Sequence, residues 1–263
     1  MSIFGRLRDN IVFMLGARRA LKMTTPIARN PKRIFPVVID ELAERFGDAP
    51  ALLSDRESLS YRALAEHANR YARWARREKL AKGETVCLLM PNRPEYMAVW
   101  IGINSVGGVV ALINTNLIGP SLAHCIDIVT PKHIIVASEL AGSFATARPL
   151  MQSMAKIWSH GESAEFPRLD HELESLSGER LPASERPPLT IEDAALYIYT
   201  SGTTGMPKAA NINHYRVMLA TGAFAGAMNT KATDRMYDCL PLYHTAGGVV
   251  ATGAVLLNGG SVV

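Results

Sequence analysis

Cysteine is scarce in this 263-residue sequence, which contains only Cys87, Cys125 and Cys239. The three are far apart and odd in number, so they fit neither a disulfide framework nor a zinc site built from paired ligands. We therefore expect a protein of a reducing compartment, the cytoplasm. The sequence predicts no metal-ligating residues.

Acidic residues are almost absent from residues 1–33, where Asp9 stands among eight of the chain's 28 basic residues. The sequence after residue 33 is slightly acidic, because it keeps all but one of the 24 acidic residues. The overall pI of about 9.0 therefore describes a basic arm and not the body. A general nucleic-acid-binding surface is not indicated, so nucleic acid is not an expected partner.

The basic arm, residues 1–33, has two interpretations that the sequence leaves open. Five apolar residues can lie on one side of a short helix: Ile3, Phe4, Leu7, Ile11 and Met14. With arginines beside them, they predict a peripheral contact with the inner face of a membrane. The alternative is a solvated, frayed terminus.

Charged residues are missing between Glu95 and Asp127 and again after Asp238. Such gaps raise the question of a transmembrane helix, which needs about 20 consecutive apolar residues. Asn104 and the polar residues 114–116 divide the first gap into shorter pieces. We therefore predict a buried helix followed by a buried strand, and no membrane span.

Hydrophobic periodicity predicts an α/β fold. Ser60 precedes a segment with apolar residues on one face through Lys79, which is the pattern of a capped amphipathic helix. Strands are predicted at 85–90, 109–113, 133–137 and 194–199, and further helices at 94–105, 120–129 and 215–228. Residues 235–240 are predicted to be extended and residues 249–257 helical. This alternation indicates parallel-rich sheets layered with helices.

Composition divides the chain into four parts. After the basic arm, residues 34–158 are predicted to form a first α/β subdomain. Residues 159–190 are polar and contain four prolines, which predicts a linker. Residues 191–263 are predicted to begin a second α/β subdomain. Because residues 261–263 resemble the first residues of a strand, we expect the chain to be truncated relative to a complete domain.

The most informative segment is YTSGTTGMPK, residues 199–208, which follows a predicted strand. Its two glycines let backbone N–H groups approach an anion without interference from a Cβ atom. Its hydroxyl groups add hydrogen-bond donors, and Lys208 supplies a compact positive charge. By composition this segment is a phosphate-binding loop.

Two other nucleotide-binding motifs do not fit this loop. The P-loop places its glycines five positions apart, whereas Gly202 and Gly205 are three apart. The P-loop lysine directly follows the second glycine, whereas two residues intervene before Lys208. The dinucleotide fingerprint G-x-G-x-x-G needs a glycine where Thr204 stands. A plain solvated turn is the remaining alternative, and the density of phosphate-binding residue types disfavours it.

The stretch TSGTTGMPK, residues 200–208, closely resembles the signature loop of the adenylate-forming superfamily, which includes acyl-CoA synthetases, luciferases and peptide-synthetase adenylation domains. The resemblance implies that the loop binds the β- and γ-phosphates of ATP. The implied contacts are Thr200, Ser201, Gly202, Thr203, Thr204, Gly205 and Lys208. Ala209 departs from the common pattern, in which glycine follows the lysine. Fatty acid transport proteins, which are very-long-chain acyl-CoA synthetases, commonly have alanine there.

A second block, YDCLPLYHTAGG at residues 237–248, is similar to that narrower branch. Alone, His244 is more often a structural histidine. At the family's spacing after the loop, it is implied to lie beside the acyl carboxylate, so His244 and Lys208 are the catalytic candidates. The segments MPNRPEY (90–96) and ALINTNL (111–117) also resemble fatty acid transport proteins. The implied fold is the N-terminal part of the large domain of an adenylate-forming enzyme.

The activity that the resemblance implies is acid–thiol ligation. A fatty acid would be activated by ATP, with Mg²⁺, to an acyl-adenylate and then transferred to CoA, so fatty acid, ATP and CoA are the expected partners. In the family, the residues for adenine, ribose, Mg²⁺ and CoA lie downstream of the position of Val263. We therefore expect the isolated chain to be inactive.

Two rival hypotheses stay open. An adenylation domain that activates another carboxylic acid and loads a carrier protein would share the loop, although not the PLYH context. A truncated, non-catalytic nucleotide-binding remnant would retain only the phosphate contacts. The sequence gives neither the chain length of the fatty acid nor the oligomeric state.

Overall fold

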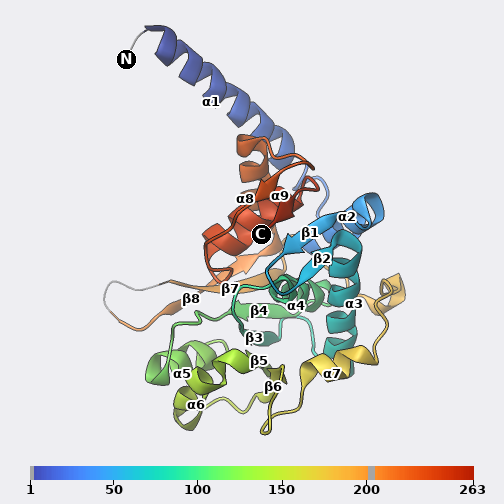
Figure 1. The fold of residues 1–263 in the computed structure, drawn as a ribbon, viewed down its shortest axis with the longest axis vertical. Coiled ribbons are helices and arrows are strands. Elements are labelled where there is room, and N and C mark those ends of the chain that lie inside the picture. The colour runs from blue at the N-terminus through green and yellow to red at the C-terminus, as the bar shows by residue number, and fades with distance from the viewer. Residues whose placement is uncertain (1–2, 201–204) are drawn as a thin grey trace.

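Two β-sheets and the helices around them make up the molecule (Figure 1). The computed structural model describes residues 3–200 and 205–263. In chain order the elements are α1 (Ile3–Thr24), α2 (Phe35–Phe46), β1 (Pro50–Leu53), β2 (Ser58–Ser60), α3 (Tyr61–Arg77), β3 (Thr85–Leu89), α4 (Pro94–Ser105), β4 (Val109–Leu112), α5 (Gly119–Asp127), β5 (His133–Ala137), η1 (Ser138–Leu140), α6 (Ala141–Ala147), η2 (Arg148–Leu150), β6 (Lys156–His160), α7 (Leu169–Glu174), η3 (Ala183–Glu185), β7 (Ala194–Thr200), β8 (Lys208–Asn213), α8 (His214–Met228), β9 (Arg235–Met236), η4 (Thr245–Thr252), α9 (Gly253–Leu256) and β10 (Ser261–Val262). The predicted α/β alternation is confirmed.

The larger sheet has six strands in the order β6-β5-β3-β4-β7-β8. Its first five strands run parallel, and β8 is an antiparallel edge strand. The sheet grows outward from β3, because Val86 pairs with Val110 of β4 on one side and with His133 of β5 on the other. The carboxyl ends of the parallel strands therefore meet at one edge, which is where open α/β sheets bind ligands.

The parallel strands are buried on both faces. Val86 and Leu88 of β3 belong to the core shared with α3 and α4. Cys87 and Leu89 belong to the opposite core, which includes Phe144 of α6. Successive side chains of a strand point to opposite faces, so burial on both faces requires the unbroken apolar run seen in the sequence.

Helix α3 confirms the predicted capped helix. The side-chain oxygen of Ser60 accepts a hydrogen bond from the N–H of Ala63, which satisfies one of the free donors at the start of the helix. One face of α3 carries buried apolar residues, including Tyr61, Leu64 and Trp74. That face packs against α4 and α2 and so covers the sheet.

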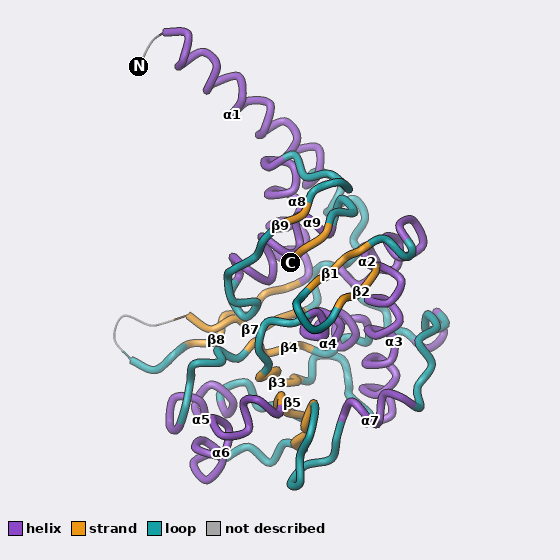
Figure 2. Tube along the Cα trace, in the orientation of Figure 1, coloured by secondary structure: helices purple, strands orange, loops and turns teal. Residues whose placement is uncertain are grey.

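Helix α4 explains the first charge-free stretch. It lies among α2, α3 and β4 (Figure 2), and all of its residues except Ser105 are buried. The carboxamide of Asn104 donates to the carbonyl oxygens of Gly108 at 3.0 Å and Ala195 at 2.8 Å, so this polar group is satisfied inside the core. The predicted buried helix and buried strand are confirmed. Among the described residues, we find no helix of the length and apolar character that crossing a membrane requires.

The smaller sheet, in the order β2-β1-β10-β9, was not predicted as a sheet, although the strand expected to begin at residues 261–263 is present as β10. Its strands have two to four residues, which is too short for a period of two to be recognised. Residues 235–240 were predicted to be extended, but only Arg235–Met236 form a strand. The helix predicted at 249–257 begins earlier, as the π-helix η4, and continues as α9.

Helix α1 projects from the body and is joined to it through α8 (Figure 1). The guanidinium Nε of Arg19 donates to the carbonyl oxygen of Gly226 at 2.9 Å. A Cβ atom at Gly226 would lie 2.5 Å from the backbone nitrogen of Ala20, so the two helices approach more closely there than a side chain would allow. Residues 159–190 contain α7 and η3, and the large sheet includes strands from both sides of this segment. The division of the chain into subdomains stays a prediction.

Candidate active site

The predicted phosphate-binding segment lies between the two antiparallel strands of a β-hairpin. Strand β7 leads into the segment and β8 leads out of it, and Thr200 pairs with Lys208 across the hairpin. Thr200, Gly205 and Lys208 are all exposed. The remaining predicted contacts, Ser201, Gly202, Thr203 and Thr204, lie outside the described residues. The structure thus brings together the two ends of the predicted loop.

Helix α5 supports both arms of this hairpin. The hydroxyl of Tyr199 donates to the carbonyl oxygen of Cys125 at 2.6 Å. Burial raises the pKa of the Tyr199 phenol, so it stays protonated and remains a donor. On the other arm, Nε2 of His124 lies 3.0 Å from the carbonyl oxygen of Pro207. Helix α5 therefore holds the hairpin at the residues that flank the predicted loop.

The hairpin lies at the carboxyl edge of the large sheet. Strand β7 runs parallel to β4, with Leu112 paired with Ile198. The segments that follow β3 and β4 therefore emerge beside the end of β7, at Thr200. These are the two segments, 90–96 and 111–117, that the sequence analysis selected. The edge thus combines three of the four segments that carry the resemblance.

The fourth segment reaches the same edge and carries His244. His244 is exposed, and its N–H donates to the carbonyl oxygen of Pro241 at 3.0 Å. Its ring centroid lies 4.7 Å from that of Tyr243, and Nδ2 of Asn116, which follows β4, lies 3.3 Å from the Tyr243 hydroxyl. Within the described ranges, no hydrogen bond or ion pair joins His244 to Lys208 directly. The two catalytic candidates share an edge, and a substrate would have to connect them.

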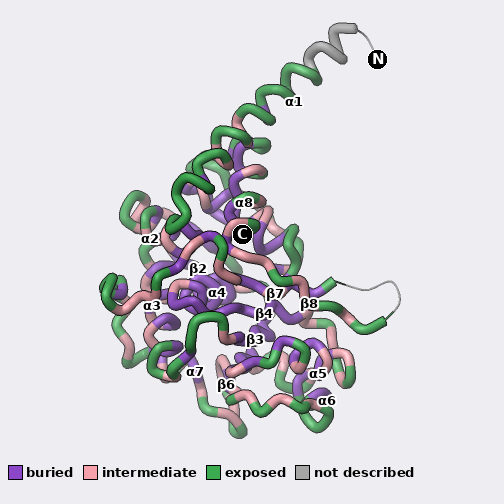
Figure 3. The backbone as a smooth tube through the Cα atoms, turned by 180° about the vertical axis from the view of Figure 1, so that it is seen from behind, coloured by how far each residue is buried: buried purple, intermediate pink, exposed green. Residues whose placement is uncertain are grey.

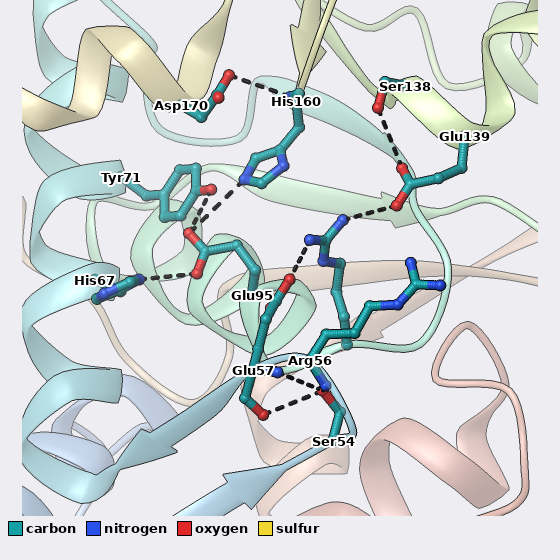
Figure 4. Close-up of polar contacts among 12 residues, drawn as sticks. Ser54, Arg56, Glu57, His67, Tyr71, Glu95, Ser138, Glu139, His160 and Asp170 are labelled. Atoms are coloured by element: carbon teal, nitrogen blue, oxygen red, sulfur yellow. Dashed lines mark hydrogen bonds and ion pairs between the residues drawn. The ribbon is translucent and has the colours of Figure 1, made fainter.

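A polar cluster around Glu95 was missed by the sequence analysis (Figure 4). Its carboxylate accepts hydrogen bonds from Tyr71 OH at 2.7 Å and from His67 Nδ1 at 2.8 Å, and Nε2 of His160 lies 4.0 Å away. Burial alone would raise the pKa of Glu95, but the hydrogen bonds from His67 and Tyr71 hold that pKa below its usual value. The sequence offered one signal for this cluster: Glu95 is a lone carboxylate in the first turn of an otherwise apolar helix.

This cluster borders a cavity of about 720 Å³. Beside it, Arg93 forms ion pairs with Glu57 and with Glu139. Lys208 and His244 do not line this cavity. A smaller cavity of about 240 Å³ lies nearer to His244 and is lined by Asn92, Leu242 and residues of β1 and β10.

No metal site is visible in the part of the chain that the structure describes, where three or more His, Cys, Asp or Glu side chains nowhere converge in a way that would hold an ion. The cation that the resemblance implies therefore finds no fitting ligand set among these residues.

Comparison with known proteins agrees with this geometry. A family model described as AMP-binding enzyme matches residues 39–263. The chain is 35% identical over 239 residues to long-chain fatty acid transport protein 1 of Bos taurus, with 88% of this chain and 36% of that protein covered. It is 32% identical over 215 residues to long-chain fatty acid transport protein 6 of Mus musculus, with 81% and 35% covered. The chain therefore spans about a third of the length of these relatives.

Solved structures show the same fold. A long-chain-fatty-acid-CoA ligase from Archaeoglobus fulgidus matches with a TM-score of 0.75 at 21% identity, over 88% of this chain and 46% of that one. An anthranilate CoA ligase in complex with anthranoyl-AMP matches with a TM-score of 0.77 at 21% identity, over 86% and 44%. The predicted fold, the N-terminal part of the large domain of an adenylate-forming enzyme, is confirmed. With the family model covering residues 39–263, this chain belongs to the AMP-binding enzyme family.

Proposed function

We propose that this chain supplies the ATP-phosphate loop and an acid-facing histidine for the activation of a long- or very-long-chain fatty acid to its CoA thioester. The observation that carries the proposal is that β7 and β8, which flank the glycine- and hydroxyl-rich loop, bring its two ends to the carboxyl edge of a parallel sheet, next to the segment that bears His244. The similarity to fatty acid transport proteins supports a fatty acid as the acid substrate.

The proposed reaction has two steps. The fatty acid carboxylate attacks the α-phosphorus of ATP, the bond to the β-phosphate oxygen breaks, and pyrophosphate leaves. The CoA thiolate then attacks the carbonyl carbon of the acyl-adenylate, and AMP leaves. Negative charge builds up on the departing pyrophosphate, so the ammonium group of Lys208 and the N–H donors of the loop would stabilise it. The exposed imidazole of His244 would orient the carboxylate.

The rival adenylation domain would form the same kind of adenylate from another acid and pass it to a carrier-protein thiol. The two proposals differ in the acid that is activated, a fatty acid or another acid, and in the thiol that accepts it, CoA or a carrier protein. We would assay formation of acyl-AMP and acyl-CoA from ATP, Mg²⁺, CoA and oleate, with benzoate and phenylalanine as competing acids. The chain would be tested alone and joined to the C-terminal part of a fatty acid transport protein.

We expect the joined protein to form oleoyl-CoA and to lose that activity when Lys208 is replaced by alanine. The 263 residues alone should give no turnover, because they span about a third of the relatives' length. A preference for benzoate or phenylalanine would favour the rival adenylation domain. Lysine-dependent turnover by the chain alone would contradict the need for a further part.

We also propose that α1 contacts an anionic lipid surface. Figure 3 shows that most of the described part of this helix is exposed, and the side chains of residues 11–15 are between 48% and 75% exposed. Five consecutive apolar residues cover every side of a helix, so one neighbouring helix cannot bury them. This differs from the one-sided stripe predicted from the sequence; Ile3, Phe4 and Leu7 of that stripe have side chains outside the described part. Arg18, which is exposed, follows the apolar turns and would complement anionic headgroups.

Vesicle sedimentation tests this contact. The chain should sediment with vesicles that contain phosphatidylserine and less with pure phosphatidylcholine. Phe13→Asp, which places a charge among the apolar residues of α1, should abolish sedimentation. Ile118→Asp changes a residue that is 60% exposed elsewhere on the surface and should leave it unchanged. Equal sedimentation of both variants, or none for the unaltered chain, would favour the solvated terminus.

A further inference from the structure

The side chain of Asn92 bonds the residues before His244 to the segment that follows β3 of the large sheet. Nδ2 of Asn92 donates to the carbonyl oxygen of Leu240 at 2.8 Å, and Oδ1 of Asn92 accepts from the N–H of Leu242 at 2.9 Å. Asn92 follows β3, whereas its partners are about 150 positions further along the chain. The same carboxamide thus holds both a carbonyl and an N–H of residues 240–244, which we call the 240–244 turn.

The 240–244 turn is itself tightly folded, so a hold at Leu240 and Leu242 is transmitted to His244. The N–H of His244 donates to the carbonyl oxygen of Pro241 at 3.0 Å, and the carbonyl oxygen of His244 accepts from Gly248 at 2.9 Å. A Cβ atom at Gly248 would lie 2.3 Å from the carbonyl oxygen of Leu242, so η4 begins in direct contact with the turn. The backbone between Leu242, which Asn92 holds, and His244 therefore has few torsion angles left free to vary.

We propose that Asn92 is a positioning residue, which fixes the 240–244 turn and thereby aims the His244 imidazole at the carboxylate of the acid substrate. Only the aim of His244 at the acid carboxylate rests on the proposed function, because Asn92 holds the turn whatever the substrate is. Asn92 also lines the cavity of about 240 Å³ next to the turn, together with Leu242. Loosening the turn would therefore change both the aim of His244 and the shape of this cavity.

A second asparagine provides a matched control. Asn116 reaches the turn from the segment after β4, but its side chain bonds there to the side-chain hydroxyl of Tyr243, at 3.3 Å. It holds no backbone group of the turn in the described structure. Asn92 is exposed apart from its two hydrogen bonds, so replacing it should leave the core intact.

The test uses the 263-residue chain and three variants. Asn92→Leu removes both hydrogen bonds at similar size, Asn92→Asp keeps the acceptor for the Leu242 N–H but removes the donor, and Asn116→Leu is the control. The first measurement is hydrogen exchange of the Leu242 amide. The second is the NMR shift of the His244 ring on addition of oleate below its micellar concentration, with His171 as the reference histidine.

We expect exchange at Leu242 to be about three- to tenfold faster in Asn92→Leu, the range that the loss of one ordinary hydrogen bond gives. Asn92→Asp should restore most of the protection, and Asn116→Leu should leave it unchanged. The oleate concentration that half-shifts the His244 signal should rise by about the same factor in Asn92→Leu.

The two parts of the argument fail in different ways. Unchanged exchange at Leu242 in Asn92→Leu would overturn the positioning role. So would a His244 response to oleate that is the same in Asn92→Leu as in the unaltered chain. If His244 in the unaltered chain does not respond to oleate while Leu242 exchange is accelerated in Asn92→Leu, the hold on the turn stands and the proposed role of His244 toward the acid is wrong.

Discussion

Two buried histidines set how the free energy of unfolding depends on pH. His214 is fully buried, and neither of its ring nitrogens has a hydrogen-bond partner among the described residues. Burial lowers the pKa of His214 to about 4, and burial likewise lowers the pKa of His133 to about 4. Both are neutral in the folded chain at pH 5, whereas the unfolded chain, with a histidine pKa of about 6.5, is protonated. The unfolded state thus binds more protons, and stability falls as pH drops from 7 toward 4.

Replacing His214 by leucine should remove part of this pH dependence. A shift of about 2.5 pKa units predicts that one such histidine destabilises the fold by about 1–2 kcal/mol between pH 7 and pH 5. Urea unfolding of His214→Leu at the two pH values should show a smaller difference than the unaltered chain. His171→Leu, at an exposed site, should keep the full difference. An unchanged difference in His214→Leu would mean that His214 is protonated in the folded state.

Glu95 should be the most costly carboxylate to neutralise among those described. Glu95→Gln keeps the shape but weakens the hydrogen bonds from His67 and Tyr71 and leaves polar groups poorly satisfied in a buried site, which costs about 1–3 kcal/mol. Glu41→Gln is the control, because the Glu41–Arg33 ion pair is exposed and such pairs contribute about 0–1 kcal/mol. Equal midpoints of urea unfolding for the two variants would show that the Glu95 cluster adds no stability.

At the scale of elements, the sequence predicted the long helices and buried strands but missed the short strands and the edge strand. Helix α4 was predicted with both of its ends, because proline marks its start and its apolar residues run without a break to Ser105. Strands β1 and β2 were missed, because they have four and three residues and pair with each other, and β1 obtains its second partner from β10, about 200 positions away. Strand β8 was missed because it is an edge strand with asparagines at Asn211 and Asn213.

The contact between α1 and α8 gives a prediction for two glycines on one helix. A methyl group at Gly226 would lie 2.5 Å from Ala20 N, so Gly226→Ala should push α1 away from α8. At Gly222 the nearest atom of α1 would be 3.6 Å away, an ordinary contact, so Gly222→Ala should be tolerated. Hydrogen exchange in residues 16–24 should accelerate in Gly226→Ala and not in Gly222→Ala. Slow exchange in both variants would contradict the close packing of the two helices.

At the scale of the whole molecule, the sequence selected the segments expected to carry the chemistry but did not show how they meet. The segments that bear Lys208 and His244 were recognised separately by their residues. Their common location follows from the strand order, since β4 pairs with β7 only after a crossover of about 80 residues. The contacts of Asn92 and Asn116 could not be predicted for the same reason: each bonds to a segment more than 120 positions away.

The central claim is that the hairpin turn binds the phosphates of ATP, and equilibrium binding by isothermal calorimetry tests it most directly. The chain should bind ATP and pyrophosphate and bind AMP more weakly, because the resemblance assigns the loop to the β- and γ-phosphates. Lys208→Ala should weaken ATP binding by about tenfold or more, as the loss of a charge-assisted hydrogen bond predicts. Lys231→Ala, an exposed lysine in the segment after α8, should have no effect. Equal ATP affinities for the two lysine variants, or equal affinities of the unaltered chain for ATP and AMP, would contradict the account.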